Sequence, residues 1–182
     1  MEVTDELKHE HRDIERVIDV IETMSERLAR GDSSMVGLLH KASSFIKGFA
    51  EGCHHVKEEE VLFPALESHG VSKESGPIGA MLYEHASGRK YIAEIEQALS
   101  QYEAGDKEAA NAVVNSVKGY TSLLRAHIQK EDMVLFPMAE KVFSEFEKHK
   151  LHEQMEEVEQ RLEGKTHHEY LRDIEDMERA VA

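Results

Sequence analysis

The chain has 182 residues, a formal net charge of -15 and 40% hydrophobic residues, which suits one domain or one domain with an appendage. The negative charge argues against nucleic acid or an anionic membrane surface as a partner. Cys53 is the single cysteine, which excludes an internal disulfide, and the sequence shows neither a signal pattern nor an apolar run long enough to span a bilayer. We therefore expect a soluble cytoplasmic protein.

Long stretches rich in Glu, Lys, Ala and Leu, interrupted by three prolines, predict an all-α fold. The first half of the chain should form two helices, over about residues 4–30 and 35–68. The apolar stripe of the first helix contains one histidine, His11. The stripe of the second helix continues through His54 and Glu58, so that polar side chains face the apolar core.

Two more helices are predicted over about residues 77–103 and 106–142. His85 lies on the apolar line of the third helix, and His127 and Glu131 lie on that of the fourth. The connections between the four helices are roughly four to ten residues long, which favours an up-down-up-down four-helix bundle.

The bundle should occupy residues 1–143, followed by a C-terminal helical extension over residues 144–182. The extension is strongly charged and has a weaker apolar stripe, which predicts one or two short helices packed on the bundle or on a partner. Thr166 and Glu169 have the spacing of a capping box, in which each side chain bonds the backbone N–H of the other residue.

Two eleven-residue stretches repeat each other: HHVKEEEVLFP, from His54 to Pro64, and HIQKEDMVLFP, from His127 to Pro137. Each contains a histidine four residues before a glutamate, and side chains at this spacing share one face of a helix. Each also ends in a proline, which should kink the last turns of its helix. Two facing copies would direct two imidazoles and two carboxylates at one point.

Six polar residues lie on the four predicted apolar faces. They are His11, His54, Glu58, His85, His127 and Glu131. Unpaired carboxylates in a bundle core would cost on the order of several kcal/mol, so a bound cation explains them better than histidines that merely bond glutamates. Imidazole and carboxylate ligands suit a divalent transition metal, iron or manganese above all. Two carboxylates could bridge two ions, and six protein ligands leave room for a hydroxide, oxide or water bridge and for a small ligand such as dioxygen.

The first copy of the repeat contains two overlapping pairs with this spacing, His54 with Glu58 and His55 with Glu59. The first pair is favoured by the alignment of the two copies on their prolines. It is also favoured by the apolar stripe that precedes His54. We expect His55, Glu59 and Glu60 to be flanking residues or to orient a ligand histidine.

Three further side chains have alternative interpretations. Tyr120, one heptad before His127, could be a core residue or a redox-active or ligand-orienting phenol. Arg89, one turn after His85, could pair with a ligand carboxylate or extend its charge to the surface. Cys53 could be a small buried apolar residue or a minor neighbour of the metal. The remaining histidines show no placement on an apolar face and are predicted at the surface.

The succession of His, His-x-x-x-Glu, His and His-x-x-x-Glu on four helices resembles the hemerythrin-like family, also called HHE cation-binding proteins. The matching phrases are EHR, HHVKEEEVLFP, EH and HIQKEDMVLFP, and the resemblance covers about residues 4–143. It implies a non-haem centre of two iron ions held by the six residues above, with Glu58 and Glu131 as bridges. Manganese or zinc are the alternatives to iron.

The chain departs from the oxygen-carrying hemerythrins on two helices. Their third helix supplies two histidines four apart, whereas Met81 and Arg89 flank His85 here. Their fourth helix uses His-x-x-x-x-Asp, and here the motif is His-x-x-x-Glu. One nitrogen ligand of the oxygen carriers is therefore missing. The resemblance implies binding of dioxygen or a related small ligand, for sensing, storage or scavenging. The alternative is a di-iron redox enzyme: an oxidase, a peroxidase or catalase-like protein, or one that reacts with nitric oxide. The sequence points to no particular protein partner.

Overall fold

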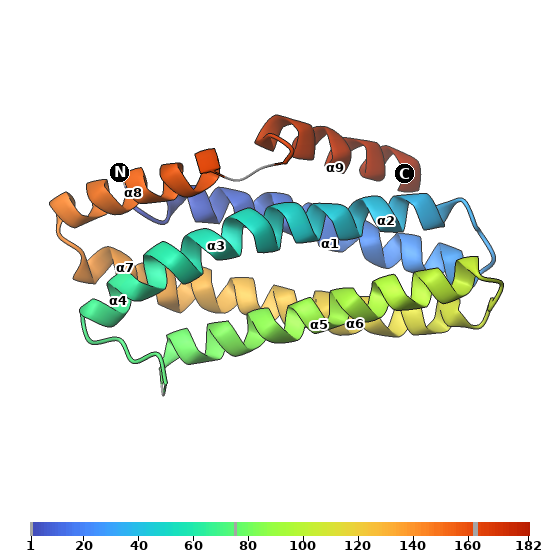
Figure 1. Cartoon of the computed structure of the whole chain (residues 1–182), viewed down its shortest axis with the longest axis horizontal. Coiled ribbons are helices and arrows are strands. Elements are labelled where there is room, and N and C mark those ends of the chain that lie inside the picture. The colour runs from blue at the N-terminus through green and yellow to red at the C-terminus, as the bar shows by residue number, and fades with distance from the viewer. Residues whose placement is uncertain (1, 75, 162–163) are drawn as a thin grey trace.

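The computed structural model describes residues 2–74, 76–161 and 164–182, and all regular structure within these ranges is helical (Figure 1). In chain order the segments are α1 Asp5–Ala29, α2 Met35–Phe45, η1 Ile46–His54, α3 His55–Lys57, η2 Glu58–Leu62, α4 Phe63–Ser68, α5 Pro77–Glu103, α6 Ala109–Lys130, η3 Glu131–Leu135, α7 Phe136–Val142, α8 Glu145–Arg161 and α9 His167–Val181, where η marks a π-helix. The predicted all-α class is confirmed.

Long helical rods lie side by side in Figure 1. The first is α1, the second runs from α2 through α4, the third is α5, and the fourth runs from α6 through α7. Helix α1 contacts both α2 and α6, and α5 contacts both α6 and α2. Each rod therefore touches two others around a common interior.

Both copies of the repeat contain a π-helical turn that α-helical spacing does not predict. The turn begins at Glu58 in η2 and at Glu131 in η3, and each ends two residues before its proline, Pro64 or Pro137. Proline lacks an N–H to donate, and its ring clashes with the carbonyl four residues earlier in an α-helix. A wider turn with an extra residue relieves that conflict, so both rods continue through the proline instead of ending there.

The interior divides into two apolar clusters with a polar layer between them. On α1, for example, His11 lies between Leu7 of one cluster and Ile14 of the other. The same order holds on the other rods, except that Ile128 of the larger cluster follows His127, so the histidines and glutamates of the predicted site occupy one level of the interior. Phe136 stacks on His11 with ring centroids 5.3 Å apart, which keeps this level closed by apolar contact.

The C-terminal extension lies along the rods as two helices, α8 and α9, placed end to end (Figure 1). Helix α9 contacts α1 and α2 and buries Ile174 and Met177, whereas α8 contacts α3 and η2 and buries Leu151. The predicted capping box is confirmed, because Thr166 accepts a bond from the N–H of Glu169 and the Glu169 carboxylate accepts one from the N–H of Thr166.

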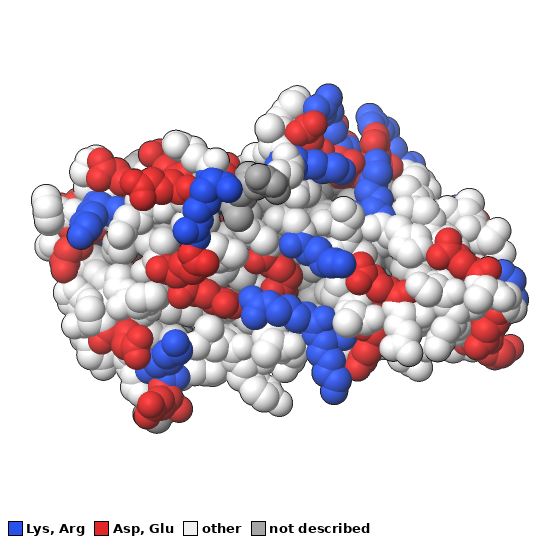
Figure 2. Space-filling model, in the orientation of Figure 1, with Lys and Arg blue, Asp and Glu red and all other residues white. Residues whose placement is uncertain are grey.

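Figure 2 shows acidic and basic side chains interspersed on one face, with acidic ones gathered over α8. None of the described helices combines the length and the hydropathy that a bilayer span requires.

The close approach of α5 and α6, which carry His85 and His127, depends on Gly119. A Cβ atom at Gly119 would lie 2.5 Å from Cε1 and 2.7 Å from Cζ of Tyr91. We expect Gly119→Ala to lower the free energy of unfolding by about 1–3 kcal/mol, the usual cost of overpacking. Urea unfolding of the metal-free protein measures this.

The matched control is Gly37→Ala, because a Cβ atom at Gly37 would meet nothing within 4 Å. Alanine is the better helix former, so this variant should gain up to about 1 kcal/mol. Equal gains in the two variants would contradict the packing role of Gly119.

Candidate metal centre

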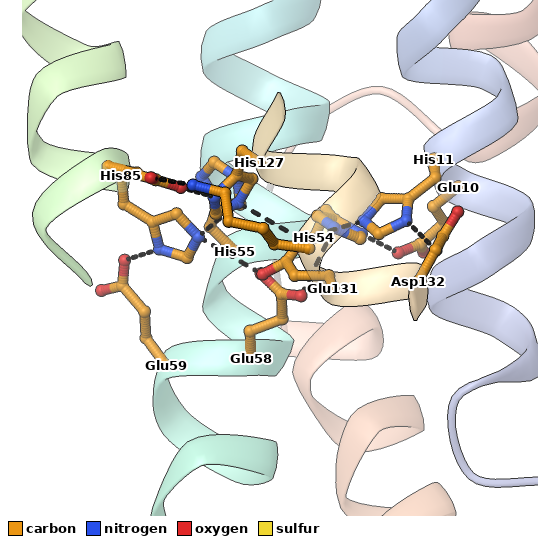
Figure 3. Close-up of polar contacts among 12 residues, drawn as sticks. Glu10, His11, His54, His55, Glu58, Glu59, His85, His127, Glu131 and Asp132 are labelled. Carbon is orange, nitrogen blue, oxygen red and sulfur yellow. Dashed lines mark hydrogen bonds and ion pairs between the residues drawn. The ribbon is translucent and has the colours of Figure 1, made fainter. Parts of the chain in front are cut away.

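Seven buried side chains converge on one point of the interior, and they form two groups that share Glu58 (Figure 3). The His11 group consists of His11, His54, Glu58 and Glu131. The His85 group consists of His55, Glu58, His85 and His127. Within each group the candidate ligand atoms all lie within 4.8 Å of one another. The structure thus brings together all six residues predicted from the sequence and adds His55.

The sequence-based placement of His55 on the flank is wrong. Its side chain is buried, it stacks on His85 with ring centroids 3.7 Å apart, and it belongs to the same group as His127. The prediction assumed α-helical geometry, in which neighbouring residues point about 100° apart and only one of the two faces inward. His54 ends the π-helix η1, where the turn is wider, and His54 and His55 serve different groups on the two sides of Glu58.

A carboxylate contacts the Nδ1 atom of each of the five histidines. The pairs are His11 with Asp132 at 2.8 Å, His54 with Glu10 at 2.8 Å, His55 with Glu51 at 3.2 Å, His85 with Glu59 at 2.7 Å and His127 with Glu84 at 2.9 Å. In four of the five pairs the contact is a hydrogen bond, and an ionised carboxylate that accepts one favours the tautomer with the proton on Nδ1 and leaves the Nε2 lone pair for a metal. The exception is His55, whose Nδ1 atom has no hydrogen-bond partner among the described residues although Glu51 lies close to it. Glu59 contacts Nδ1 of His85, as the orienting alternative predicted, whereas exposed Glu60 pairs with Arg161 instead.

The other four carboxylates beside these histidines were not predicted from the sequence, although most of them adjoin a predicted ligand. Glu10 precedes His11 but supports His54 on another rod, and Glu84 precedes His85 but supports His127. Asp132 likewise follows Glu131 and supports His11. The acidic neighbours of the motif residues were therefore the available signal, but their partners could not be read from spacing along a single helix.

Each of these carboxylates in turn contacts a cation. Arg12 lies 2.5 Å from Asp132, Lys57 lies 2.7 Å from Glu10, Arg89 lies 2.7 Å from Glu51 and 2.6 Å from Glu59, and Lys130 contacts Glu84. Arg89 therefore pairs with Glu51 and Glu59, and one guanidinium contacts the carboxylates beside both His55 and His85. The cations offset much of the negative charge that the carboxylates bring to the centre.

The polar atoms that face the middle of the centre lack hydrogen bonds. All four carboxylate oxygens of Glu58 and Glu131, and the Nε2 atoms of His11 and His54, are buried without a hydrogen bond to any described residue. Burial and the charge of Glu131 raise the pKa of Glu58 well above its usual range. Burial opposes ionisation of Glu131 as well, but His127 and His11 outweigh it and lower the pKa of Glu131 to about 2. A bound cation would satisfy every one of these atoms, so the donor set fits a metal.

Comparison with known proteins agrees with this geometry. The sequence model of the hemerythrin HHE cation-binding domain matches residues 2–139. The chain belongs to this family. The match ends in α7, so α8 and α9 lie outside the HHE domain.

Curated relatives are more distant. The chain is 26% identical over 162 residues to the uncharacterized protein Rv1995 of Mycobacterium tuberculosis, covering 89% of this chain and 63% of that protein. It is 30% identical over 123 residues to the iron-sulfur cluster repair protein YtfE of Yersinia pseudotuberculosis, covering 64% of this chain and 54% of that protein. The chain thus spans less than two thirds of the length of these curated relatives.

Two other side chains near the HHE centre belong to neither group. Cys53 is buried, and burial raises the pKa of its thiol to about 12, which favours the interpretation as a small apolar residue. Tyr120 is buried in the larger apolar cluster, in line with a core role. Its hydroxyl has no hydrogen-bond partner within the described ranges, and burial raises its pKa.

Glu58 should oppose folding of the metal-free protein. Because its pKa is raised in the folded state, its charged form destabilises that state once the pH exceeds the pKa of the unfolded chain. We expect Glu58→Gln to raise the melting temperature of the chelator-treated protein at pH 7 and to abolish most of the stabilisation that added iron(II) gives the wild type. The exposed substitution Glu67→Gln should change neither quantity. A metal-free Glu58→Gln protein less stable than wild type would contradict the electrostatic cost assigned to Glu58.

Proposed function

We propose that the protein is a non-haem di-iron protein of the hemerythrin-like type, a four-helix bundle with a C-terminal helical extension. One ion would be held by the His11 group and the other by the His85 group, with Glu58 common to both. Glu131 supports the same arrangement, because its Oε2 atom lies 3.3 Å from Nε2 of His11 and 3.2 Å from Nε2 of His127. Both carboxylates are thus within reach of both groups and suit the role of bridges.

The donor chemistry favours iron, with manganese or zinc as alternatives. Five imidazoles and two carboxylates suit divalent transition metals, and the shared carboxylates match the sites that bundle proteins build for two ions. Bound iron would supply redox capacity and a coordination position for a small ligand. The protein's own residues orient four of the five imidazoles through hydrogen bonds at Nδ1, and apolar side chains around the centre limit the access of water.

We further propose that this centre binds dioxygen or a related small ligand, as a sensor, a store or a scavenger in the cytoplasm. The observation that carries the proposal is the convergence of five histidines and two glutamates at one buried level. With His55 the centre offers seven protein donors, the number expected of an oxygen carrier of this family. The sequence alone predicted six of these donors.

The second candidate is a di-iron redox enzyme. It is favoured by the similarity to relatives named as iron-sulfur cluster repair proteins, since that name implies iron chemistry rather than storage of a gas. An oxidase, a peroxidase or catalase-like activity, or reaction with nitric oxide would use the same donors.

Protein purified without air and loaded with iron(II) distinguishes the two candidates. We expect two iron ions per chain and an ultraviolet-visible spectrum that changes when oxygen is added and reverts when it is removed. Rapid turnover of peroxide or nitric oxide would favour the enzyme instead. Far fewer than two ions per chain would overturn the dinuclear proposal.

Substitution of two neighbouring histidines tests the assignment of the two groups. His54→Ala should weaken the His11 group and His55→Ala the His85 group, so each variant should retain about one iron(II) per chain at concentrations that saturate wild type. His40→Ala is the control, because this half-exposed residue pairs with Glu103 and belongs to neither group. Metal analysis after gel filtration measures the content. A His55→Ala protein that still holds two ions would remove His55 from the centre.

A further inference from the structure

Lys57 is a lysine with no exposed side-chain surface, and it lies beside the metal centre. Its Nζ atom contacts Glu6, lies 2.7 Å from Glu10 and lies 3.1 Å from Glu159. Glu6 and Glu10 belong to α1, whereas Glu159 belongs to α8, beyond the part of the chain that matches the HHE domain. One buried ammonium thus joins three carboxylates from two helices.

These contacts continue to the candidate ligands. The second carboxylate oxygen of Glu10 lies 2.8 Å from Nδ1 of His54, and Lys57 itself immediately precedes Glu58. At the other end, Glu159 lines a cavity of about 210 Å³ between the C-terminal extension and η1. An unbroken series of polar contacts, from Glu159 through Lys57 and Glu10 to His54, therefore connects the extension to the centre.

Lys57 differs in burial from the other cations around the centre. Its side chain is 0% exposed, compared with 53% for Arg12, 46% for Arg89 and 44% for Lys130. Ion pairs at exposed positions are weakened by water and salt, whereas a buried pair acts at a lower effective dielectric. Burial alone would lower the pKa of Lys57, but Glu10 and its neighbours raise it, so the ammonium remains charged.

We propose that Lys57 is a positioning residue for the metal centre and that α8, through Glu159, sets how firmly Lys57 holds Glu10 against His54. This inference rests on the proposed binding of iron. Without Lys57 the buried Glu10 carboxylate would lose its counter-charge and would no longer be fixed in the orientation that His54 requires. Without Glu159 the ammonium would keep Glu6 and Glu10 but would lose its contact with the extension.

The two substitutions should change the reduction potential in opposite directions. A positive charge near the centre favours the reduced state, which carries less positive charge, and a negative charge favours the oxidised state. Lys57→Met should therefore shift the midpoint potential of the iron-loaded protein to a lower value, and Glu159→Gln should shift it to a higher value. A purely structural loosening would move both variants in the same direction.

Loss of iron to a chelator provides a second measurement. We expect iron(II) to leave Lys57→Met at least about tenfold faster than wild type, the scale at which outer-shell partners affect metal affinity. Glu159→Gln should release it several-fold faster. Arg161→Gln is the matched control on α8, because it removes an exposed ion pair with Glu60 and leaves the Lys57 contacts intact. This control should match wild type in both measurements.

The outcomes separate the two proposals. If wild-type protein fails to bind two iron ions, the proposed function fails before the variants are compared. If wild type binds iron, and Glu159→Gln folds but has the potential and release rate of Arg161→Gln, then α8 has no influence on the centre and this inference is wrong. If Lys57→Met does not fold, the comparison of Glu159→Gln with Arg161→Gln still decides the matter.

Discussion

The structure depends on the burial of two carboxylates in an otherwise apolar interior. Glu58 and Glu131 have no exposed surface, and none of their oxygens has a hydrogen-bond partner within the described residues. A helical interior with this composition would be strongly disfavoured unless a cation neutralised it. The surrounding histidines, their carboxylates and the cations beyond them all serve to offset or orient this charge. Metal binding and folding are therefore expected to be linked.

That constraint also connects the rods to one another. Glu10 on α1 orients His54 on the second rod, Glu84 on α5 orients His127 on α6, and Asp132 on the fourth rod orients His11 on α1. If one rod shifted, it would misplace its own histidine. It would also displace the carboxylate that contacts a histidine on another rod. Such cross-support makes the geometry of the centre a property of the assembled rods rather than of any single helix.

Periodicity within single helices predicted much of this arrangement but not all of it. The apolar stripes located His11 and His85 because a polar residue at such a position needs an explanation. They failed for His55, because the π-helical turn before it changes the angular step that the stripe assumes. The contact between Lys57 and Glu159 spans 102 residues, and no local pattern encodes a pairing of that kind. Sequence reasoning thus identified residues that face the core, and the structure was needed to pair those that meet across helices.

The two halves of the centre differ in how their surroundings are held. The His85 group depends on Arg89 and Lys130, whose exposed side chains make their ion pairs sensitive to salt. In the His11 group, His54 depends instead on Lys57, which is buried and contacts carboxylates of both α1 and α8. His11 of the same group depends on Asp132 and on Arg12, which is 53% exposed, so the buried support belongs to His54 alone and not to the whole His11 group. The C-terminal extension contributes to the support of His54 because Glu159 of α8 contacts Lys57, which in turn contacts Glu10. A segment outside the HHE domain thus takes part in holding one histidine of the centre.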